Sequence, residues 1–431
     1  MNPLVLMLLT FFAALVVGVP VAFSLGLASV SYLLVTGRFA WALLSQRMFS
    51  IVDSFPLLAV PFFILAARLM EDSGILGSLL ELSRALVGHI RGGLAHVNIV
   101  ASMFFAGITG SPTADTAAIG SALIPAMVAE DYPLDFSAAV TVSSSTIGPI
   151  IPPSIPMVIY ALVEGRTSLA ALFLAGFVPG ILVGFALMFV AWVICVRRGF
   201  GLTRSRRITL KELWPIMGRS FMALLMPIII LGGILTGIFT PTEASATAVG
   251  YAFIVGFFVT KRLKLDSLPD HFLSTAITTA SVLFVLAASS VFGWILTVEQ
   301  VPNQLARAFL EFSSDPAIFL LLVNLMLLIV GCFMNTTSAI TILAPILSPI
   351  ALSMGINPVH FGFVMVMNLI LGQITPPVGS CLFVVCGISE VTMEEVSKAV
   401  LPFLAAEIVI LFLVTYVPSV CLFIPRMFGF V

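Results

Sequence analysis

Apolar residues recur in long runs from one end of the chain to the other, and short polar stretches separate them. The runs fall near residues 4–36, 56–72, 93–129, 133–164, 170–196, 216–260, 272–298, 315–353, 357–388 and 398–425. Most of them reach the length of about 20 residues that an α-helix needs to cross a bilayer. The pattern therefore predicts an all-α polytopic membrane protein.

Two of these runs are too long for one crossing, and each contains a motif that interrupts helices. Residues 4–36 would form a single helix of roughly 48 Å at about 1.5 Å per residue, and the sequence GVP at 18–20 offers a break. Residues 216–260 contain TPT at 240–242. Because proline removes a backbone donor and clashes with the preceding turn, each run is predicted to form two short, tilted spans.

The composition agrees with a membrane location. Of the 431 residues, 60% are hydrophobic and 9% are charged, whereas soluble domains carry roughly 25% charged residues. The formal net charge of −1 gives no indication of nucleic-acid binding. The N-terminal segment lacks a basic start and a small-residue cleavage site, so it is predicted to be a retained span. The five cysteines form no metal-ligand or disulfide pattern: Cys195, Cys332, Cys381, Cys386 and Cys421.

The polar stretches between the runs give information on topology. The amphipathic segments 38–53 and 75–91 predict either helices in the membrane interface or ordinary loops. The most basic segment is RRGFGLTRSRRITLK. Since basic residues accumulate on the cytoplasmic side, 201–211 is predicted to be a cytoplasmic connector between two halves. The topology then closes only if 93–129 and 315–353 each enter and leave on one face, as re-entrant helical hairpins.

A double proline occurs twice, and its spacing reveals an internal repeat. Pro152-Pro153 recurs as Pro376-Pro377, and 376 − 152 = 224. The same shift, without any gap, places GITGSPTADTAAIG over GCFMNTTSAITILA and GPIIPPSIP over GQITPPVGS. It matches Gly107 with Gly331, Thr113 with Thr337, Pro125 with Pro349, Gly148 with Gly372 and Ile150 with Ile374. The agreement of these pairs on one shift predicts two structurally related halves.

Each predicted half contains scaffold helices, one hairpin and one broken helix. The first half is 1–200, with hairpin 93–129 and broken helix 133–164; the second is 212–431, with hairpin 315–353 and broken helix 357–388. An odd number of crossings separates the two, so they are predicted to face opposite sides of the membrane. Inverted repeats with paired, Gly/Pro-broken helices indicate a secondary transporter whose binding site lies at the breaks.

The chemistry of a broken helix explains why it would bind something. A helix that stops inside the membrane presents free carbonyl groups, which can hold Na⁺. A helix that restarts presents free N–H groups and the positive end of its dipole, which favour a carboxylate. Serine and threonine hydroxyls beside each break add oxygens suited to a hard cation.

Four segments together resemble the large membrane subunit of tripartite ATP-independent periplasmic (TRAP) transporters: GSPTADTAAIGSALIPAM, SSSTIGPIIPPSIPMVIYA, GIFTPTEA and GQITPPVG. The resemblance covers essentially the whole chain. It implies an elevator-type transporter of the bacterial inner membrane that co-transports two or more Na⁺ ions with a carboxylate, such as sialic acid, a C4-dicarboxylate or another organic acid.

The resemblance also implies partners. A soluble periplasmic binding protein is expected to deliver the substrate. A small four-helix membrane subunit is expected as a separate polypeptide, because the chain begins directly at the large subunit's first span. Membrane lipid is expected to surround the complex.

Site residues follow from placing the family's motifs on this sequence. The first Na⁺ site is expected at Ser111, Thr113, Asp115, Ser144, Ser145, Gly148 and Pro152. The second is expected at Asn335, Thr336, Thr337, Gly372, Thr375 and Pro377. The substrate carboxylate is expected between the hairpin tips, near Ser111, Pro112, Asn335 and Thr336. No catalytic residue is expected.

Two acids near the breaks have open roles. Asp115 is the one acid at a hairpin tip, and its repeat mate is Ala339. It is expected either to cap the returning helix or to bind an ion, since intramembrane carboxylates are costly and usually functional. Glu243, beside the TPT motif, is expected to anchor the scaffold or to pair with a cation.

Other classes of protein account for part of the pattern. A single-component Na⁺-coupled dicarboxylate elevator symporter would share the hairpins and broken helices but would need no partner subunit. An intramembrane hydrolase would need a nucleophile with a base, or an aspartate pair. No G-x-S-x-G occurs, and Asp115 has no evident partner acid. A channel would also use carbonyl sites, but an inverted repeat around occluded breaks favours alternating access.

Overall fold

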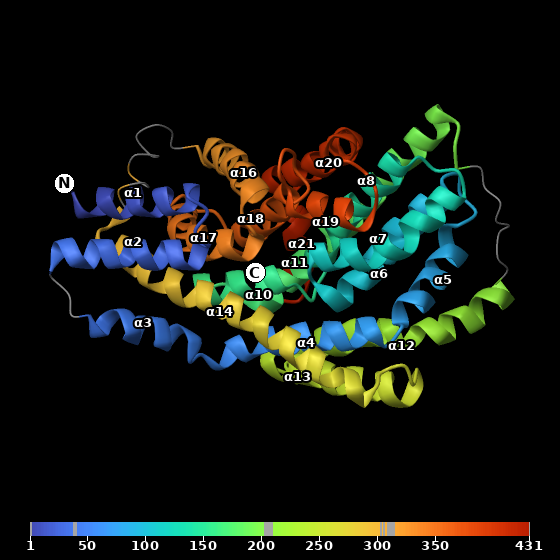
Figure 1. The fold of residues 1–431 in the computed structure, drawn as a ribbon, viewed down its shortest axis with the longest axis horizontal. Coiled ribbons are helices and arrows are strands. Elements are labelled where there is room, and N and C mark those ends of the chain that lie inside the picture. The colour runs from blue at the N-terminus through green and yellow to red at the C-terminus, as the bar shows by residue number, and fades with distance from the viewer. Residues whose placement is uncertain are drawn as a thin grey trace.

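The computed structural model describes residues 2–37, 41–201, 210–301, 304, 307 and 315–430, and the regular elements in these ranges are helices (Figure 1). Among them, seven helices are long and apolar enough to cross a membrane, or up to nine if each of two bent pairs is one span. The prediction of an all-α polytopic membrane protein is confirmed. Within the predicted connector 201–211, residues 202–209 lie outside the described ranges.

The helices of the first half end where glycine or proline interrupts the apolar pattern. α1 ends at Val16, and α2 begins at Val21, after Gly18 with its left-handed backbone (φ +87°) and Pro20. The GVP motif therefore divides its run into two helices, as predicted. The elements are α1 (Pro3–Val16), α2 (Val21–Thr36), α3 (Ala42–Val52), the 3₁₀ helix η1 (Phe55–Leu58), α4 (Ala59–Asp72), α5 (Ile75–Val87), α6 (Gly93–Thr109), α7 (Pro112–Ala129), α8 (Leu134–Ser145), α9 (Ile147–Ile150), α10 (Ile155–Glu164) and α11 (Leu169–Arg198).

The second half shows the same kind of signal at the TPT motif. Thr240 and Glu243 form a capping box at the start of α13, in which each side chain accepts a hydrogen bond from the other residue's backbone N–H. Glu243 therefore anchors the first turn of this helix. The elements are α12 (Leu210–Leu235), α13 (Pro241–Ile254), the π-helix η2 (Val255–Val259), the 3₁₀ helix η3 (Leu265–Ser267), α14 (Leu268–Val298), α16 (Pro316–Phe333), α17 (Thr336–Ser353), α18 (Pro358–Gly372), α19 (Ser380–Ile388), α20 (Met393–Tyr416) and α21 (Ser419–Met427).

Both amphipathic segments contain a helix, so their interpretation as ordinary loops is wrong. α3 lies within 38–53 and α5 within 75–91. α3 and the segment from η1 to α4 are together long and apolar enough to form one span, bent by 58°. In Figure 1 they run along α14, with which both α3 and α4 are in contact.

The helices of the two halves occur at matching positions when the chain is shifted by 224 residues. α7 and α17 start at 112 and 336 and end at 129 and 353. In each half a double proline with a cis peptide bond follows the next helical segment, and a short helix, α10 or α19, comes after it. Length and composition would let α16 and α17 each cross a membrane, so the re-entrant topology of the hairpins stays a prediction.

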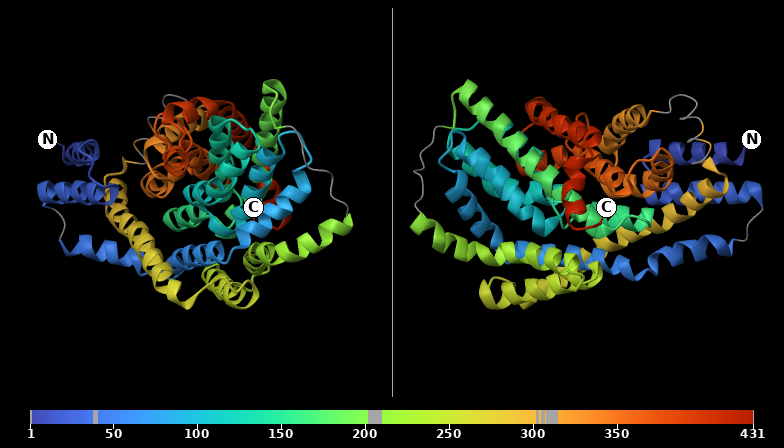
Figure 2. Two further views of the ribbon diagram at one scale, coloured as in Figure 1. Left: turned by 45° about the vertical axis from the view of Figure 1, so that its right-hand side comes forward. Right: turned by 180° about the vertical axis from the view of Figure 1, so that it is seen from behind.

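The helices form an outer layer and an inner bundle. The outer layer consists of α1–α4 and α12–α14 and lies along one side of the bundle of α6–α11 and α16–α21 (Figure 2). A separate apolar cluster holds α1, α2 and α14 together, with Met7, Leu25 and Phe292 buried in it. This part of the outer layer therefore has a core of its own, whereas α4, α12 and α13 pack in the main apolar cluster of the bundle.

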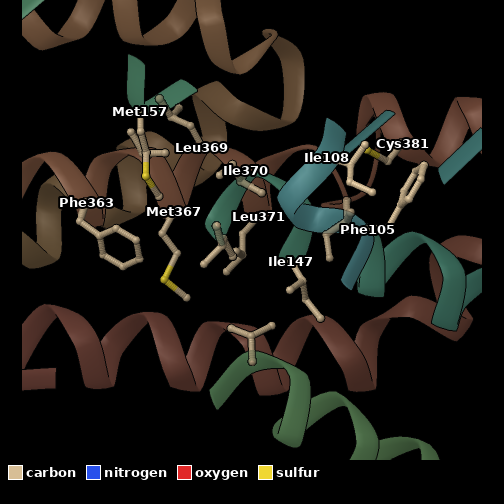
Figure 3. Packing of buried hydrophobic residues seen from close by; sticks show 14 of the residues in the cluster. Phe105, Ile108, Ile147, Met157, Phe363, Met367, Leu369, Ile370, Leu371 and Cys381 are labelled. Carbon is tan, nitrogen blue, oxygen red and sulfur yellow. The ribbon is translucent and has the colours of Figure 1, made fainter. Parts of the chain in front are cut away.

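Within the bundle the two halves interleave. α10, from the first half, packs on α17 and α18, and α19, from the second half, packs on α7 and α8. Tyr160 of α10 is fully buried, and a β-carbon on Gly362 of α18 would stand 2.3 Å from its ring. Ile147 and Leu371, one from each half, lie in one apolar cluster (Figure 3). The halves therefore share a single core.

Candidate functional site

The first break lies between α9 and α10. α8 ends at Ser145, α9 covers only Ile147–Ile150, and both Ile151 and Ser154 have extended backbones before α10 begins. The last carbonyl groups of one helix and the first N–H groups of the next have no partner inside their own helix. The break therefore presents oxygens suited to a cation beside N–H groups suited to an anion.

The tip of the first hairpin packs against this break. Gly110 has a left-handed backbone, and a β-carbon on it would stand 2.8 Å from the carbonyl oxygen of Pro153. In the first turns of α7, Thr116 Oγ1 lies 2.8 Å from Ser145 Oγ. The structure thus brings together the hairpin tip and the break from which the first ion site was predicted.

Asp115 is fully buried and lies against Gly148 of α9, just before this break. One of its carboxylate oxygens accepts a hydrogen bond from Thr109 Oγ1, whereas Oδ2 has no hydrogen-bond partner. A β-carbon on Gly148 would stand 2.0 Å from Oδ2, so only glycine leaves room for the carboxylate. Because the side chain bonds Thr109 and not an N-terminal amide of α7, the capping role is wrong. An unpartnered buried carboxylate oxygen favours the alternative, contact with a cation.

The hydroxyl groups of Ser144 and Ser145 are engaged in bonds within the bundle. Ser144 Oγ has two acceptors for its hydrogen, Asn98 Oδ1 at 2.9 Å and the carbonyl oxygen of Thr141 at 3.0 Å, and it accepts from Ser102 Oγ at 2.9 Å. Ser145 Oγ donates to the carbonyl oxygen of Val142 at 2.7 Å. Since a hydroxyl has one hydrogen and two acceptor positions, Ser145 keeps at least one lone pair even when Thr116 donates to it and not to the carbonyl oxygen of Pro112, which is also at 2.8 Å. Ser144 is better suited to offer its main-chain oxygen.

The second break has the same outline as the first. α18 ends at Gly372, and a β-carbon on this residue would stand 2.5 Å from the α-carbon of Gly331 in α16. Thr375 Oγ1 donates to the carbonyl oxygen of Leu371 at 2.9 Å. The carbonyl oxygen of Thr375 accepts from Cys332 Sγ at 3.1 Å. Both oxygens of this predicted ligand therefore already have a partner.

Gln373 gives the second break a chemistry that the first lacks. It holds the position of Pro149 in the first half, and its side-chain amide donates a hydrogen bond to Thr336 Oγ1. Ser380 Oγ donates to Gln373 Oε1 at 3.0 Å. Thr336 Oγ1 also lies 3.3 Å from the carbonyl oxygen of Leu369. Gln373 therefore joins the tip of the second hairpin to both sides of its break.

A cavity of about 420 Å³ lies between the two hairpin tips and the outer layer. Its lining contains all four residues predicted to hold substrate, together with Thr113 and Thr337. The first residues of α7, α10 and α17 face it, and none of the described residues that line it is charged. The rest of the lining is Gly110, Ile155, Pro156, Ser338 and Gln373 from the bundle and Ile64, Ile277, Thr278, Ser281, Val282 and Val285 from α4 and α14.

The other predicted ion ligands do not line the cavity. They belong to the breaks and to the first turns behind the tips: Asp115, Ser144, Ser145, Gly148, Pro152, Gly372, Thr375 and Pro377. The predicted substrate residues and most of the predicted ion ligands thus occupy different places.

Sequence reasoning missed the outer wall of the cavity and Gln373. Thr278, Ser281 and Val285 share one face of α14 at helical spacing, but the sequence does not indicate which face turns toward the hairpins. Arg68 of α4 lies 3.4 Å from Thr278 Oγ1 and was missed for the same reason. Gln373 stands inside a motif that was recognised, yet a comparison of matched repeat positions passes over it.

Comparison with known proteins agrees with this architecture. Residues 8–420 match the sequence model of the family described as "Tripartite ATP-independent periplasmic transporter, DctM component". The chain is 43% identical to the isethionate TRAP transporter permease protein DctMQ of Oleidesulfovibrio alaskensis, over 98% of this chain and 66% of that protein. It is 40% identical to the sialic acid TRAP transporter large permease protein SiaM of Vibrio cholerae, over 95% of this chain and 96% of that protein.

A solved structure shares the fold. The crystal structure of the YdaH transporter of Alcanivorax borkumensis, described as having an unusual topology, matches with a TM-score of 0.66. The match covers 96% of this chain and 98% of that one at 14% sequence identity. At this identity the likeness concerns the fold alone.

Proposed function

Because the chain belongs to the DctM-component family of tripartite ATP-independent periplasmic transporters, we propose that it imports an organic acid across the bacterial inner membrane by Na⁺-coupled, elevator-type alternating access. Its relatives are transporter permeases and not enzymes. The prediction that the chain is not an enzyme is thereby confirmed, and the hydrolase alternative is excluded.

The convergence of three helix N-termini on one cavity supports an anionic substrate. α7, α10 and α17 each begin at its wall, where no charged side chain of the described residues competes. Helix N-termini favour anions through free N–H groups and the helix dipole. Isethionate and sialic acid, named for two relatives, are a sulfonate and a carboxylate. We assign the acidic group of the substrate to the tips, at Ser111, Pro112, Asn335 and Thr336.

Two Na⁺ ions would bind at the breaks behind the tips. At the first, Asp115 Oδ2 and the carbonyl oxygens near Ser144, Ser145 and Gly148 supply hard ligands beside Thr113. At the second, the oxygens come from neutral groups of Asn335, Thr337, Gly372, Thr375 and Pro377 or their neighbours. The observation that most directly supports a bound cation is that Asp115 Oδ2 is buried and has no hydrogen-bond partner.

The family is tripartite, so a small membrane subunit and a periplasmic substrate-binding protein are proposed as partners. The test is uptake into proteoliposomes under an imposed Na⁺ gradient, with the chain alone and with both partners. We expect uptake only with both partners and Na⁺. Robust uptake by the chain alone would instead identify the single-component symporter.

Elevator movement predicts that the inner bundle slides past the outer layer. Cysteines at Thr113 of α7 and Val282 of α14, which line the same cavity, should stop uptake when a short bifunctional reagent joins them. The matched control joins Phe23 of α2 to Phe284 of α14, whose rings are 5.1 Å apart in the outer layer and do not line this cavity, and should leave uptake intact. Unimpaired uptake after complete cross-linking of the first pair would refute the elevator mechanism.

A further inference from the structure

A second fully buried carboxylate meets the junction between α8 and α9. Glu407 projects from α20, and its side chain has no exposed surface. Its Oε1 lies 3.2 Å from Thr146 Oγ1, and its Oε2 has no hydrogen-bond partner. Glu407 was not among the predicted ligands, and its repeat mate is Val183.

The hydrogen bonds of Thr146 bear on the protonation state of Glu407. Thr146 Oγ1 lies 2.7 Å from the carbonyl oxygen of Ser143, which can only accept, and 3.2 Å from Glu407 Oε1, so its single hydroxyl hydrogen favours the shorter contact with Ser143. The contact with Glu407 Oε1 then brings a lone pair of Thr146 toward the carboxyl group. Two acceptors repel each other, and the contact becomes a hydrogen bond only if Glu407 itself carries the hydrogen.

No basic group neutralises Glu407 among the described residues. The nearest charged residues along α20 are in its first two turns, where Lys398 pairs with Glu394 at 2.6 Å. On the neighbouring α18, the ring of His360 bonds the carbonyl oxygen of Val414 at 3.0 Å. An ionised carboxylate buried without a partner is so costly that such groups take up a proton instead.

We propose that Glu407 is a proton-binding site: it is a neutral carboxylic acid that donates a hydrogen bond to Thr146 Oγ1 and so fastens α20 to the α8–α9 junction. The ligand is H⁺ and not Na⁺, which separates this site from the ion sites assigned above. The same junction thus meets two acids, with a cation assigned to Asp115 and a proton to Glu407.

Infrared difference spectroscopy of the purified full chain tests the proposal directly. Subtracting the spectrum of Glu407→Gln from that of the wild type should isolate the C=O stretch of a protonated carboxylic acid. The matched control is Glu164→Gln. Glu164 Oε2 accepts from the backbone N–H of Arg166 at 2.9 Å and from Thr167 N and Oγ1 at 2.7 Å, which stabilises its ionised form. Its difference spectrum should contain carboxylate bands only.

A second variant keeps the test decisive if Glu407→Gln does not fold. Thr146→Ala removes the acceptor and leaves the acid in place, so the protonated-acid band should shift to higher frequency without disappearing. Carboxylate bands lost in Glu407→Gln, or a protonated-acid band unmoved by Thr146→Ala, would overturn the proposal.

The Na⁺ dependence of uptake gives an independent readout. Because glutamine reproduces the shape and the donor of a neutral acid, Glu407→Gln should change the Na⁺ concentration for half-maximal uptake by less than about twofold. A rise of about tenfold or more would mean that the charge of Glu407 holds Na⁺, which would overturn the proton assignment.

Discussion

The two hairpin-and-break units share a backbone plan and differ in their polar chemistry. In the first, the carboxylate of Asp115 lies against Gly148. In the second, Ala339 replaces the acid, and Gly372 lies against the main chain of Gly331. The repeat therefore preserves the glycines and prolines that shape the chain, while the charge at each site varies independently. A cation at the first break would meet a full negative charge, and one at the second would meet only dipoles.

The largest expected effect comes from filling the space beside the two matched glycines, Gly148 and Gly372. Both Gly148→Ala and Gly372→Ala insert a methyl group where no space exists, which should destabilise the protein by about 1–3 kcal/mol or more. The obstacle at Gly148 is a side chain, so Asp115→Ala should recover much of the loss. The obstacle at Gly372 is main chain, so no trimming of a side chain should rescue it.

Melting temperatures of the single and double variants in detergent measure this difference as a double-mutant cycle. Equal behaviour of the two glycines, with no recovery in Gly148→Ala/Asp115→Ala, would show that Asp115 does not fill the space beside Gly148.

The next effect concerns charge. Asp115→Asn keeps the volume and removes the charge, so the Na⁺ concentration for half-maximal uptake should rise by about ten- to hundredfold. Gln373→Leu should leave the Na⁺ curve almost unchanged and weaken substrate binding, because Gln373 lines the cavity and orders Thr336. Na⁺-titrated and substrate-titrated uptake, with the partner proteins supplied, separate the two outcomes. Equal Na⁺ shifts in both variants would contradict the assignment of charge to the first break.

Threonine hydroxyls give a smaller effect of the same kind. Thr113→Val and Thr337→Val each delete an oxygen at equivalent tips, and each should cost about 1–2 kcal/mol, or roughly five- to thirtyfold in the Na⁺ requirement. Thr375→Val should do less, since that hydroxyl already donates to a carbonyl group. The matched control is Thr10→Val in α1, whose hydroxyl donates to Leu6 at 2.8 Å. A shift in the control as large as at the tips would show that the hydroxyls do not act as ligands.

The smallest expected effect is the loss of stability on removing the N-cap side chains of two matched helices, α20 and α11. Thr392 begins α20 with a capping box to Glu395, whereas its repeat mate Ser168 begins α11 with one side-chain contact at 3.4 Å. Thr392→Ala should therefore lower the free energy of unfolding by about 1 kcal/mol, and Ser168→Ala by less. Thermal melting of both variants decides the order. A larger loss for Ser168→Ala would mean that cap geometry does not set these stabilities.

Residues that act on their own backbone made most of the fold predictable. GVP, TPT and the two double prolines remove donors or supply left-handed turns wherever they stand, so the helix breaks follow from the sequence. Packing is different. The local sequence does not predict that α3 and α4 pack along α14, because this packing depends on which helix faces meet after folding.

The candidate site divides in the same way. The tips around Ser111 and Asn335 were predicted, because helix breaks and hydroxyls occur there together in the sequence. Glu407 was not predicted, since the sequence around a single acid in an apolar run does not indicate which residues the acid contacts in the fold. Gln373 shows a further limit: a repeat search finds positions that match, and this residue matters because it differs from Pro149.

The interleaving of α10 with α17 and α18 has a consequence for synthesis of the chain. The ribosome completes α10 at Glu164, but its packing partner α18 ends only at Gly372, which is 372 − 164 = 208 residues later. At about 5–20 residues per second, that interval lasts roughly 10–40 s. Throughout it the face of α10 that packs on α18, where Tyr160 lies against Gly362, lacks that partner, and α10 has only its contacts with α4, α9, α11 and, late in the interval, α17. The first half is therefore an unfinished product in the membrane until translation has almost ended.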